Sequence, residues 1–428
     1  MDTIFALSSG QPPAAIGIVR VSGPEAGAAV RALCGAVPQA RRATVSLFSD
    51  PATGEALDRG LVLWFPGPAT ATGEDLAEFH CHGGRAVTAA ILAALGQVEG
   101  LRPAQPGEFT RRAYENGRID LSEAEGLSDL LFAETESQRR AAMAMAEGAF
   151  SRKVADWQER LLILSAMTEA ALDFSDEDDV PDTDIGDRIA HGMEHMLAEL
   201  HLELRRPHAE TLREGIRVVL AGPPNAGKST LLNALVGRDA AIVSDIAGTT
   251  RDRIEVPVAF MGMPFLVTDT AGLRDFSGDV IEAVGIARTE EAVRAADILL
   301  WLGDPEAAPR ADAVTIATKK DLDGWAAPDG IDLAVSARSG EGMDALVALI
   351  CAMATKLIPA EGGYALHARQ RREMEAVSGQ LTDALDVHDM LLVAEHLRAA
   401  RTALDRVTGR AGTEDMLDAL FGKFCIGK

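Results

Sequence analysis

The sequence is poor in aromatic and basic residues. It has two tyrosines and four tryptophans among 428 residues, too few for a surface on which the bases of single-stranded RNA could stack. Acidic residues number 65 against 41 basic ones, which gives a net charge of −24. A surface of this charge does not bind nucleic acid non-specifically, so any RNA contact must come from a local basic patch or from a partner.

Long apolar runs and patterned cysteines are also missing. No apolar run reaches the ~18 residues that a membrane span requires. Near the start, the acidic Asp2 and the breaks at Gly10 and Pro12 do not fit a signal peptide. The cysteines show neither metal-ligand spacing nor a disulfide framework, which indicates a reducing compartment; they are Cys34, Cys81, Cys351 and Cys425. We therefore expect a cytoplasmic protein without membrane contact.

The length and composition predict a globular protein with several domains. Hydrophobic residues make up 47% and charged residues 25% of the chain, as in soluble globular proteins. A chain of 428 residues is too long for one ordinary core, which favours about two to four domains.

The clearest motif lies at residues 216–231. An apolar run at 216–221 is typical of a buried parallel strand. It leads into Gly222-Pro-Pro-Asn-Ala-Gly-Lys-Ser229, which fits the phosphate-binding pattern G-x-x-x-x-G-K-[ST] and precedes a predicted helix. Gly222 and Gly227 allow backbone N–H groups to face a phosphate. Lys228 is expected to reach the β- and γ-phosphates, and the Ser229 hydroxyl to bind Mg²⁺.

Further motifs follow in the order of a GTP-binding domain. The segment Gly248-Thr-Thr-Arg-Asp252 suits a switch loop whose threonine joins Mg²⁺ when a γ-phosphate is bound. In Asp269-Thr-Ala-Gly272, Asp269 is expected beside Mg²⁺ and the Gly272 N–H at the γ-phosphate. In Thr318-Lys-Lys-Asp321, the Asp321 carboxylate can accept hydrogen bonds from N1–H and the 2-amino group of guanine. With a base-contacting loop at 336–340, these motifs predict a GTPase.

Two departures from the common GTPase pattern matter. Thr318 stands where asparagine is usual, so guanine specificity should rest mainly on Asp321, with Lys319 packed over the ring. Leu273 stands where Ras-like proteins carry the glutamine that orients the attacking water, which leucine cannot do. Another group must position the water, and the loop that contains Glu282 is where we expect it. From its chemistry alone, Glu282 is equally well an exposed acid at a helix start.

The remaining segments flank the GTPase. Strands predicted at 16–23 and 61–65 with helices at 26–33 and 85–95 make residues 1–118 a small α/β or α+β domain. His80, Cys81 and His82 suggest a metal site, but alternate residues of a strand point to opposite faces, so a structural role is favoured.

Residues 119–210 and 365–428 are predicted to be helical. Leu121 to Leu172 forms one long helical series, and a further helix is expected from Ile185 to Arg206. The acidic loop at 173–179 could bind a cation or a basic partner, although a solvated linker is favoured. The simplest arrangement is one helical domain into which a GTPase domain at 215–357 is inserted.

Over nearly its whole length the chain resembles the tRNA-modification GTPase family MnmE, also called TrmE. The residues that carry the resemblance are D-T-I at 2–4, G-I-V-R-V-S-G at 17–23, T-G-E-D at 72–75, P-G-E-F-T at 106–110, N-G-R-I-D-L-S-E-A-E at 116–125, G-T-T-R-D at 248–252 and F-C-I-G-K at 424–428. It implies a multidomain α/β plus α fold: an N-terminal α+β folate-binding and dimerisation domain, a discontinuous helical domain, and an inserted Ras-like P-loop domain.

The resemblance also implies a reaction and its partners. Such proteins form homodimers and act with the flavoprotein MnmG, in a heterotetramer or larger complex that binds tRNA. They add aminomethyl or carboxymethylaminomethyl groups to C5 of the wobble uridine, U34. The implied one-carbon donor is 5,10-methylene-tetrahydrofolate, with 5-formyl-tetrahydrofolate as an analogue. Arg20, Glu78, Arg118 and Lys428 are the implied folate ligands; the family usually has lysine where Arg118 stands, which changes the contact geometry.

The resemblance extends to GTPases that are activated by K⁺ and by dimerisation of their GTPase domains. K⁺ near the β- and γ-phosphates would supply the positive charge of an arginine finger. Its implied ligands are Asn225, Ser244, Ile246 and Thr249, and those of Mg²⁺ are Ser229 and Thr250. Glu282 matches the family's catalytic acid, which orients the attacking water through a second water. Cys425 is implied in the modification chemistry as nucleophile or acid.

The residues expected to contact GTP comprise the phosphate loop, the switch loop and the base loops. They are Asn225, Ala226, Gly227, Lys228, Ser229, Thr230, Ser244, Asp245, Ile246, Ala247, Gly248, Thr249, Thr250, Asp269, Thr270, Ala271, Gly272, Thr318, Lys319, Asp321, Ser336, Ala337 and Arg338.

An alternative function is that of a ribosome-assembly GTPase, a binding switch with the same phosphate loop. Such proteins typically add a basic RNA-binding module or a second GTPase domain, and neither is visible here. The GTPase domain of an iron transporter is a weaker alternative because the sequence has no membrane spans.

Overall fold

A computed structural model describes residues 2–173, 182–237, 255–270, 289–360, 362–410 and 414–428. The chain divides into two compact units, residues 1–128 with 405–428 (unit 1) and residues 129–404 (unit 2). Unit 1 combines a sheet with helices, and unit 2 combines long helices with a second, mostly parallel sheet. The predicted multidomain fold is thereby confirmed. The three-part division of the chain is not tested by this two-way division and stays a prediction.

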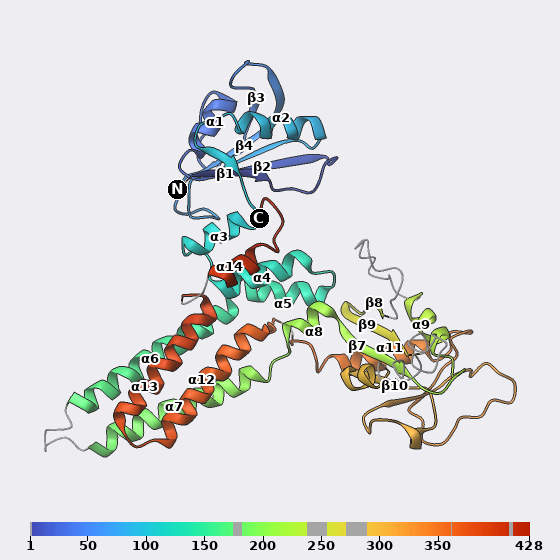
Figure 1. Cartoon of the computed structure of the whole chain (residues 1–428). Coiled ribbons are helices and arrows are strands. Elements are labelled where there is room, and N and C mark those ends of the chain that lie inside the picture. Colours follow the sequence, from blue (N-terminus) through green and yellow to red (C-terminus); the bar gives the residue numbers. More distant parts are fainter. Residues whose placement is uncertain (1, 174–181, 238–254, 271–288, 361, 411–413) are drawn as a thin grey trace, which may run out of the picture. The chain divides into compact units, whose positions relative to one another are not determined.

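Unit 1 is built on a six-stranded sheet in the order β3-β4-β5-β2-β1-β6. Helices α1 (Ala26–Cys34) and α2 (Arg85–Leu95) pack on one face, where Val19, Phe48 and Phe79 form the core (Figure 1). The strands are β1 (Thr3–Leu7), β2 (Ile16–Ser22), β3 (Thr44–Ser49), β4 (Ala56–Phe65), β5 (Leu76–His82) and β6 (Leu101–Pro103).

Strand β4 is longer than predicted. The sequence indicates a strand only over the apolar residues 61–65, whereas pairing with β3 begins at Ala56. The first half of β4 is polar because its side chains alternate across a sheet with one open face. The alternation predicted for β5 is confirmed: Cys81 is buried, and His82 is exposed and bonded to Asp58.

The C-terminal residues of unit 1 close over helix α3 (Glu108–Glu115). Phe421 and Phe424, at and after the end of α14 (Glu414–Phe421), pack in one apolar cluster with Tyr114. Ile426 pairs with Pro106 in a β-bridge. Gly107 lies at φ +69°, and a Cβ there would meet the Phe421 carbonyl oxygen at 2.1 Å, so only glycine fits.

A charged network ties the start of the chain to α3. Arg112 is only 8% exposed and donates to the Asp2 carboxylate at 2.8 Å, to Glu108 at 3.1 Å and to Glu74 at 3.2 Å. Burial raises the pKa of Glu108, but hydrogen bonds from Arg102, the Gln105 N–H and Arg112 outweigh it and hold the pKa below its usual value. Hydrogen bonding to Arg102 likewise lowers the pKa of Asp2.

We expect Arg112→Met to lower the unfolding free energy by about 3 kcal/mol at pH 7, because it leaves the largely buried Glu74 carboxylate without its arginine and removes one of the two arginines that bond to Asp2 and Glu108. Carboxylates with depressed pKa values stabilise the fold above their unfolded pKa of about 4, and this contribution is lost as the pH falls through the folded pKa. The penalty should therefore shrink in urea unfolding at about pH 3.5. Arg111→Met removes exposed ion pairs and serves as control, with an expected loss under about 1 kcal/mol; equal losses in both variants would contradict the prediction.

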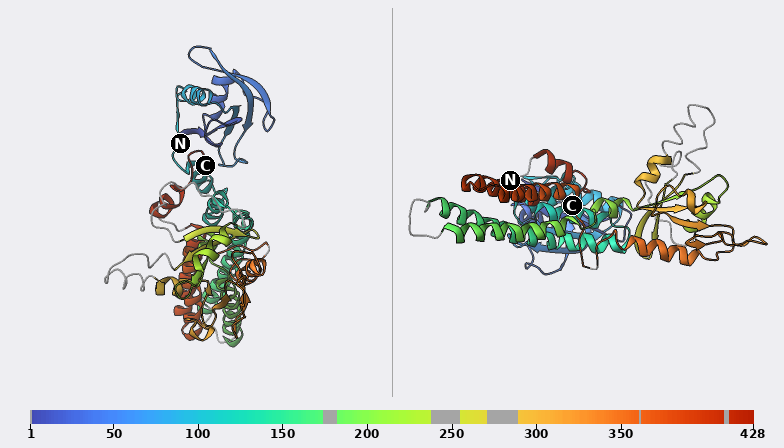
Figure 2. Two further views of the ribbon diagram at one scale, coloured as in Figure 1. Left: turned by 90° about the vertical axis from the view of Figure 1, so that its right-hand side faces the viewer. Right: turned by 90° about the horizontal axis from the view of Figure 1, so that it is seen from below.

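The helical part of unit 2 contains α5 (Glu136–Ala146), α6 (Ala149–Asp173), α7 (Asp182–Leu204) and α12 (Ala368–Asp386). Helices α6, α7 and α12 lie side by side (Figures 1 and 2). The apolar positions predicted for 185–206 are confirmed, since Ile189, Met193, Met196 and Leu200 are buried. Helices α4 (Leu121–Phe132) and α13 (Met390–Thr408) cross the boundary between the units along the chain.

The helical character predicted for 121–172 is confirmed, and the stretch forms three helices, α4, α5 and α6. Helix α5 starts at a capping box, in which the Thr135 side chain accepts from the Gln138 N–H and the Gln138 side chain accepts from the Thr135 N–H. Gly148, at φ +76°, separates α5 from α6.

The second sheet has the order β12-β11-β10-β7-β9-β8, and only β8 runs antiparallel to its neighbour. Strand order reverses at β7, and ligands of such sheets bind at the carboxyl ends of the strands beside this reversal. Its elements are β7 (Ile216–Ala221), α9 (Lys228–Val236), β8 (Glu255–Phe260), β9 (Met263–Asp269), β10 (Ile298–Trp301), β11 (Val314–Ala317), β12 (Leu333–Ala334) and α11 (Met343–Ala354), with the short α8 (Ala209–Glu214) before β7 and a 3₁₀ turn at Pro305–Ala307.

Within the described ranges, none of the helices combines the length and the apolar character needed to cross a membrane.

Candidate active site

The phosphate loop follows β7 directly. Gly222 has φ +152°, and a Cβ there would meet the Leu302 carbonyl oxygen at 2.8 Å, while Gly227 has φ +92° and caps α9. Lys228 is 7% exposed, and its ammonium donates to the carbonyls of Gly222 and Pro223, both at 3.0 Å. The loop thus folds around this cation, next to the N-terminus of a helix that favours anions.

Two oxygen donors meet beside the loop. The Ser229 hydroxyl donates to the Asp269 carboxylate at 2.5 Å, and Asp269 is buried at the end of β9, opposite Leu220 of β7. Thr270 is also buried and donates to the Leu220 carbonyl at 2.9 Å. A hydroxyl and a carboxylate at this distance fit Mg²⁺, which takes hard oxygen ligands together with substrate phosphates.

The base-binding loops come together as predicted from the order of their motifs. Ser336 is fully buried, and its hydroxyl donates to the Asp321 carboxylate at 2.6 Å. The Ser339 N–H donates to the Ser336 hydroxyl in turn, at 3.0 Å. This hydrogen bond from Ser336 lowers the pKa of Asp321 below its usual value. Asp321 is therefore an oriented anion, suited to accept from the N1–H and 2-amino group of guanine.

The structure adds contacts that the sequence did not predict. The Thr318 hydroxyl donates to the Ala226 carbonyl at 2.7 Å, and the Lys319 ammonium donates to the Asn225 carbonyl at 2.8 Å. Asn225 and Lys319 both lie at φ +61°, a left-handed conformation that asparagine adopts more readily than most residues. No motif signals these contacts, because they join residues more than 90 positions apart.

Several predicted site residues lie outside the described residues. They are Ser244, Asp245, Ile246, Ala247, Gly248, Thr249, Thr250, Ala271, Gly272 and Glu282. The acidic loop at 173–179 lies outside them from residue 174 onward.

Two of the four predicted folate ligands are brought together in unit 1. Arg20 on β2 and Glu78 on β5 are register partners and form an ion pair at 2.9 Å. The Glu78 carboxylate also bonds to His80 at 3.2 Å, and the Phe109 ring lies 5.9 Å from the Arg20 guanidinium. Burial raises the pKa of Glu78, but hydrogen bonds from Arg20 and His80 keep it below its usual value. His80 and Phe109 are neighbours that the motifs did not indicate.

The other two predicted folate ligands belong to different parts of unit 1. Arg118 donates to the Thr70 carbonyl at 3.0 Å. Lys428 lies at the chain end, where Gly427 packs against Leu7, and Cys425, three residues earlier, is exposed. Among the contacts of the described residues, neither Arg118 nor Lys428 bonds to Arg20 or Glu78.

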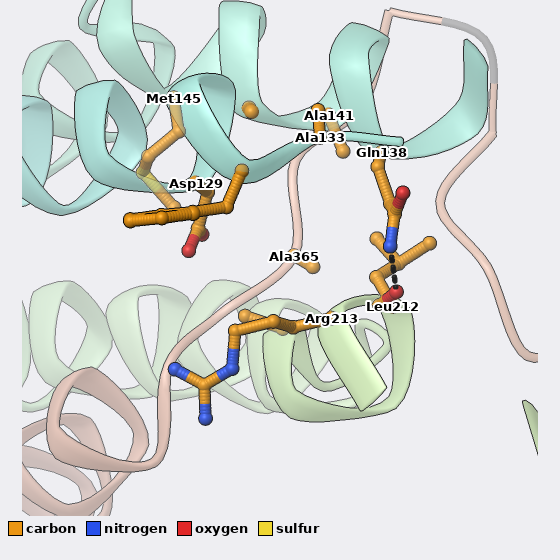
Figure 3. A pocket seen from close by; sticks show the side chains of 11 residues that line it. Asp129, Ala133, Gln138, Ala141, Met145, Leu212, Arg213 and Ala365 are labelled. Atoms are coloured by element: carbon orange, nitrogen blue, oxygen red, sulfur yellow. Dashed lines mark hydrogen bonds between the residues drawn. The ribbon is translucent and has the colours of Figure 1, made fainter. Parts of the chain in front are cut away.

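Two cavities of unit 2 differ in size and lining. A pocket of about 30 Å³ between α5 and α8 is lined mainly by alanine, leucine and methionine, and Gln138 reaches across it to the Leu212 carbonyl at 2.8 Å (Figure 3). This volume is too small for a nucleotide or a folate. Beside the phosphate loop, a cavity of about 600 Å³ is bounded by Pro223, Thr270 and Trp301.

Comparison with known proteins agrees with this geometry. Residues 3–118 match the family model described as the GTP-binding protein TrmE N-terminus, and residues 121–425 match the MnmE helical domain. The tRNA modification GTPase MnmE of Rhizorhabdus wittichii is 60% identical over 429 residues, with 100% of this chain and 97% of the relative covered. The protein of the same name from Erythrobacter litoralis is 56% identical, with both chains fully covered.

Among solved structures, the G domain of the T. maritima FeoB iron transporter is 25% identical to the chain. The match has a TM-score of 0.24 and covers 32% of this chain and 98% of that one.

Proposed function

Because the chain belongs to the MnmE family of tRNA modification GTPases, we propose that it is the GTP-hydrolysing component of C5 modification of the wobble uridine, U34. The observation that carries the GTPase assignment is the assembled phosphate loop with the buried Lys228, the Ser229–Asp269 pair and the oriented Asp321. The ribosome-assembly alternative is disfavoured because residues 3–118 match a TrmE N-terminal domain.

The predicted site residues have distinct proposed roles in hydrolysis. The Lys228 ammonium, now bonded to loop carbonyls, exchanges one of them for phosphate oxygens and stabilises the charge that develops on them. Ser229 and Thr250 would hold Mg²⁺ with Asp269 beside it, and the ion would neutralise charge on the β- and γ-phosphates. Glu282, outside the described residues, is proposed to orient the attacking water, since Leu273 cannot.

The proposal includes activation of GTP hydrolysis by K⁺. Asn225 is exposed at the outer turn of the phosphate loop, and its carboxamide oxygen has the hard-donor character that an alkali cation needs. With Ser244, Ile246 and Thr249 as the remaining ligands, K⁺ would supply at the phosphates the positive charge that an arginine finger otherwise provides. Pairing of two GTPase domains would shield this site from water.

We expect GTP turnover to be about tenfold faster or more in KCl than in NaCl of equal ionic strength. Asn225→Ala should remove this difference. Because Asn225 lies at φ +61°, alanine also strains the backbone, so Asn225→Gly is the matched control: it removes the carboxamide without strain. If both variants keep the response to K⁺, Asn225 is not a ligand. Equal wild-type turnover in the two salts would contradict the potassium proposal and leave the GTPase assignment standing.

The proposal also includes a folate-binding site in unit 1. The Arg20–Glu78 pair fits a folate because a guanidinium binds carboxylates and a carboxylate accepts from pterin N–H groups. Arg118 and Lys428 are proposed to complete the site, and bound 5,10-methylene-tetrahydrofolate supplies the one-carbon unit. Equilibrium binding of 5-formyl-tetrahydrofolate to wild type and Arg20→Met tests the site. Cys425 is proposed to act as nucleophile or acid in the modification chemistry, for which its exposure is suitable.

The proposed assembly is a homodimer that binds an MnmG-like flavoprotein. On the sheet of unit 1, Val45 is 61% exposed and Leu47 53% exposed, and Leu61 lies beside Val45 on β4. An apolar group of this kind on an edge strand suits a second copy of the chain, which sedimentation can test. Because the net charge is −24, we propose that tRNA is bound through the complex. The cytoplasmic location stays a prediction.

A further inference from the structure

Hydrogen bonds join the base loop at 318–321 directly to the phosphate loop at 222–229. The Thr318 hydroxyl donates to Ala226 and the Lys319 ammonium to Asn225, two successive carbonyls of the phosphate loop. The indole N–H of Trp325 donates to the Thr318 carbonyl at 3.1 Å and fixes this residue from the other side. Thr318 is therefore held by both its side chain and its backbone.

The hydroxyl of Thr318 has no second proton to give. A threonine hydroxyl carries one donor and two acceptor lone pairs, whereas the asparagine amide carries two donors and an acceptor. An asparagine here could donate to Ala226 and to the base at the same time. Thr318 donates its single proton to Ala226, so it can only accept further hydrogen bonds.

The edge of guanine that passes Thr318 offers only acceptors. If the phosphates bind in the loop at 222–229 and the N1–H and 2-amino group bind at Asp321, the five-membered ring would lie between them, where Thr318 bridges the two loops. Guanine N7 is an acceptor without a proton. Two acceptors cannot form a hydrogen bond.

We propose, on the basis of the proposed GTPase function, that Thr318 is a specificity-determining residue. It joins the two loops and makes no hydrogen bond to guanine N7. The base is then recognised through Asp321 and the Ser336 loop alone. The site should accept guanine nucleotides altered at position 7, while it still rejects those that lack the 2-amino group.

The test is competition of GTP, 7-deaza-GTP and ITP against a fluorescent GTP carrying its label on the ribose. In wild type, GTP and 7-deaza-GTP should bind within about twofold of each other, whereas ITP should bind about tenfold to a hundredfold more weakly, because Asp321 loses one charge-assisted hydrogen bond. Thr318→Asn should create a preference for GTP over 7-deaza-GTP of about fivefold, the worth of one hydrogen bond.

Two further variants distinguish the loss of the Thr318–Ala226 hydrogen bond from the loss of a contact with the base. Thr318→Ser keeps the hydroxyl and should behave like wild type. Thr318→Val removes the hydroxyl at nearly constant shape and should weaken GTP and 7-deaza-GTP equally. A wild-type preference of fivefold or more for GTP over 7-deaza-GTP would overturn this inference alone. A chain that binds neither GTP nor 7-deaza-GTP would overturn the proposed function together with it.

Discussion

Replacing Lys228 with methionine is expected to lower kcat/KM for GTP hydrolysis by about a hundredfold to a thousandfold. The ammonium is buried and already lies among the carbonyls of the loop, so its charge acts on the phosphates with little reorganisation. Methionine keeps the length and apolar stem of the side chain but removes the charge that stabilises the transferred phosphoryl group.

The measurement is steady-state phosphate release, with nucleotide affinity determined separately by fluorescence. Lys356→Met, an exposed lysine after α11, is the matched control and should leave both quantities unchanged. Circular dichroism must show the same fold in both variants. If turnover in Lys228→Met stays within a few-fold of wild type, the loop at 222–229 is not the hydrolytic site.

The chemistry of the phosphate loop could be predicted because its signal is local. Gly222, Lys228 and Ser229 are within eight positions of one another, and their roles depend on a strand, a turn and a helix start. Asp269 and Asp321 also follow from short motifs at strand ends. The structure brings these groups to one edge of the sheet, since β9, β7, β10 and β11 are successive neighbours in it.

Contacts that depend on register and long-range packing could not be predicted in the same way. The tether from Thr318 to Ala226 and the network of Arg112 with Asp2 and Glu74 join residues far apart in sequence. The break before α5 is a different case: Thr135 and Gln138 form the spacing of a capping box, a readable signal within a helix-rich sequence. Strand β3, from Thr44, was also missed, because it is a short edge strand with exposed apolar residues on one face.

Asp321 gives the prediction with the largest effect on specificity. Its carboxylate is proposed to accept from both N1–H and the 2-amino group of guanine, and the Ser336 hydroxyl donates to it at 2.6 Å. In Asp321→Asn, the amide oxygen still accepts from N1–H, but the amide N–H₂ meets the 2-amino group, so two donors face each other. Because two donors face each other and one hydrogen bond is lost, GTP affinity should fall by about a hundredfold or more.

The same variant should gain affinity for XTP. Xanthine carries an oxygen at position 2, which accepts from the new amide, so the preference for GTP over XTP should reverse. Asp323→Asn, an exposed neighbour, has the same change of charge and should keep the wild-type preference. Asp321→Ala removes both hydrogen bonds and should bind neither nucleotide well. If Asp321→Asn still prefers GTP, the base is read elsewhere. Suppose that the preference reverses in Asp321→Asn and that wild type binds GTP and 7-deaza-GTP equally well. The purine is then selected by a single carboxylate, which one serine holds in place.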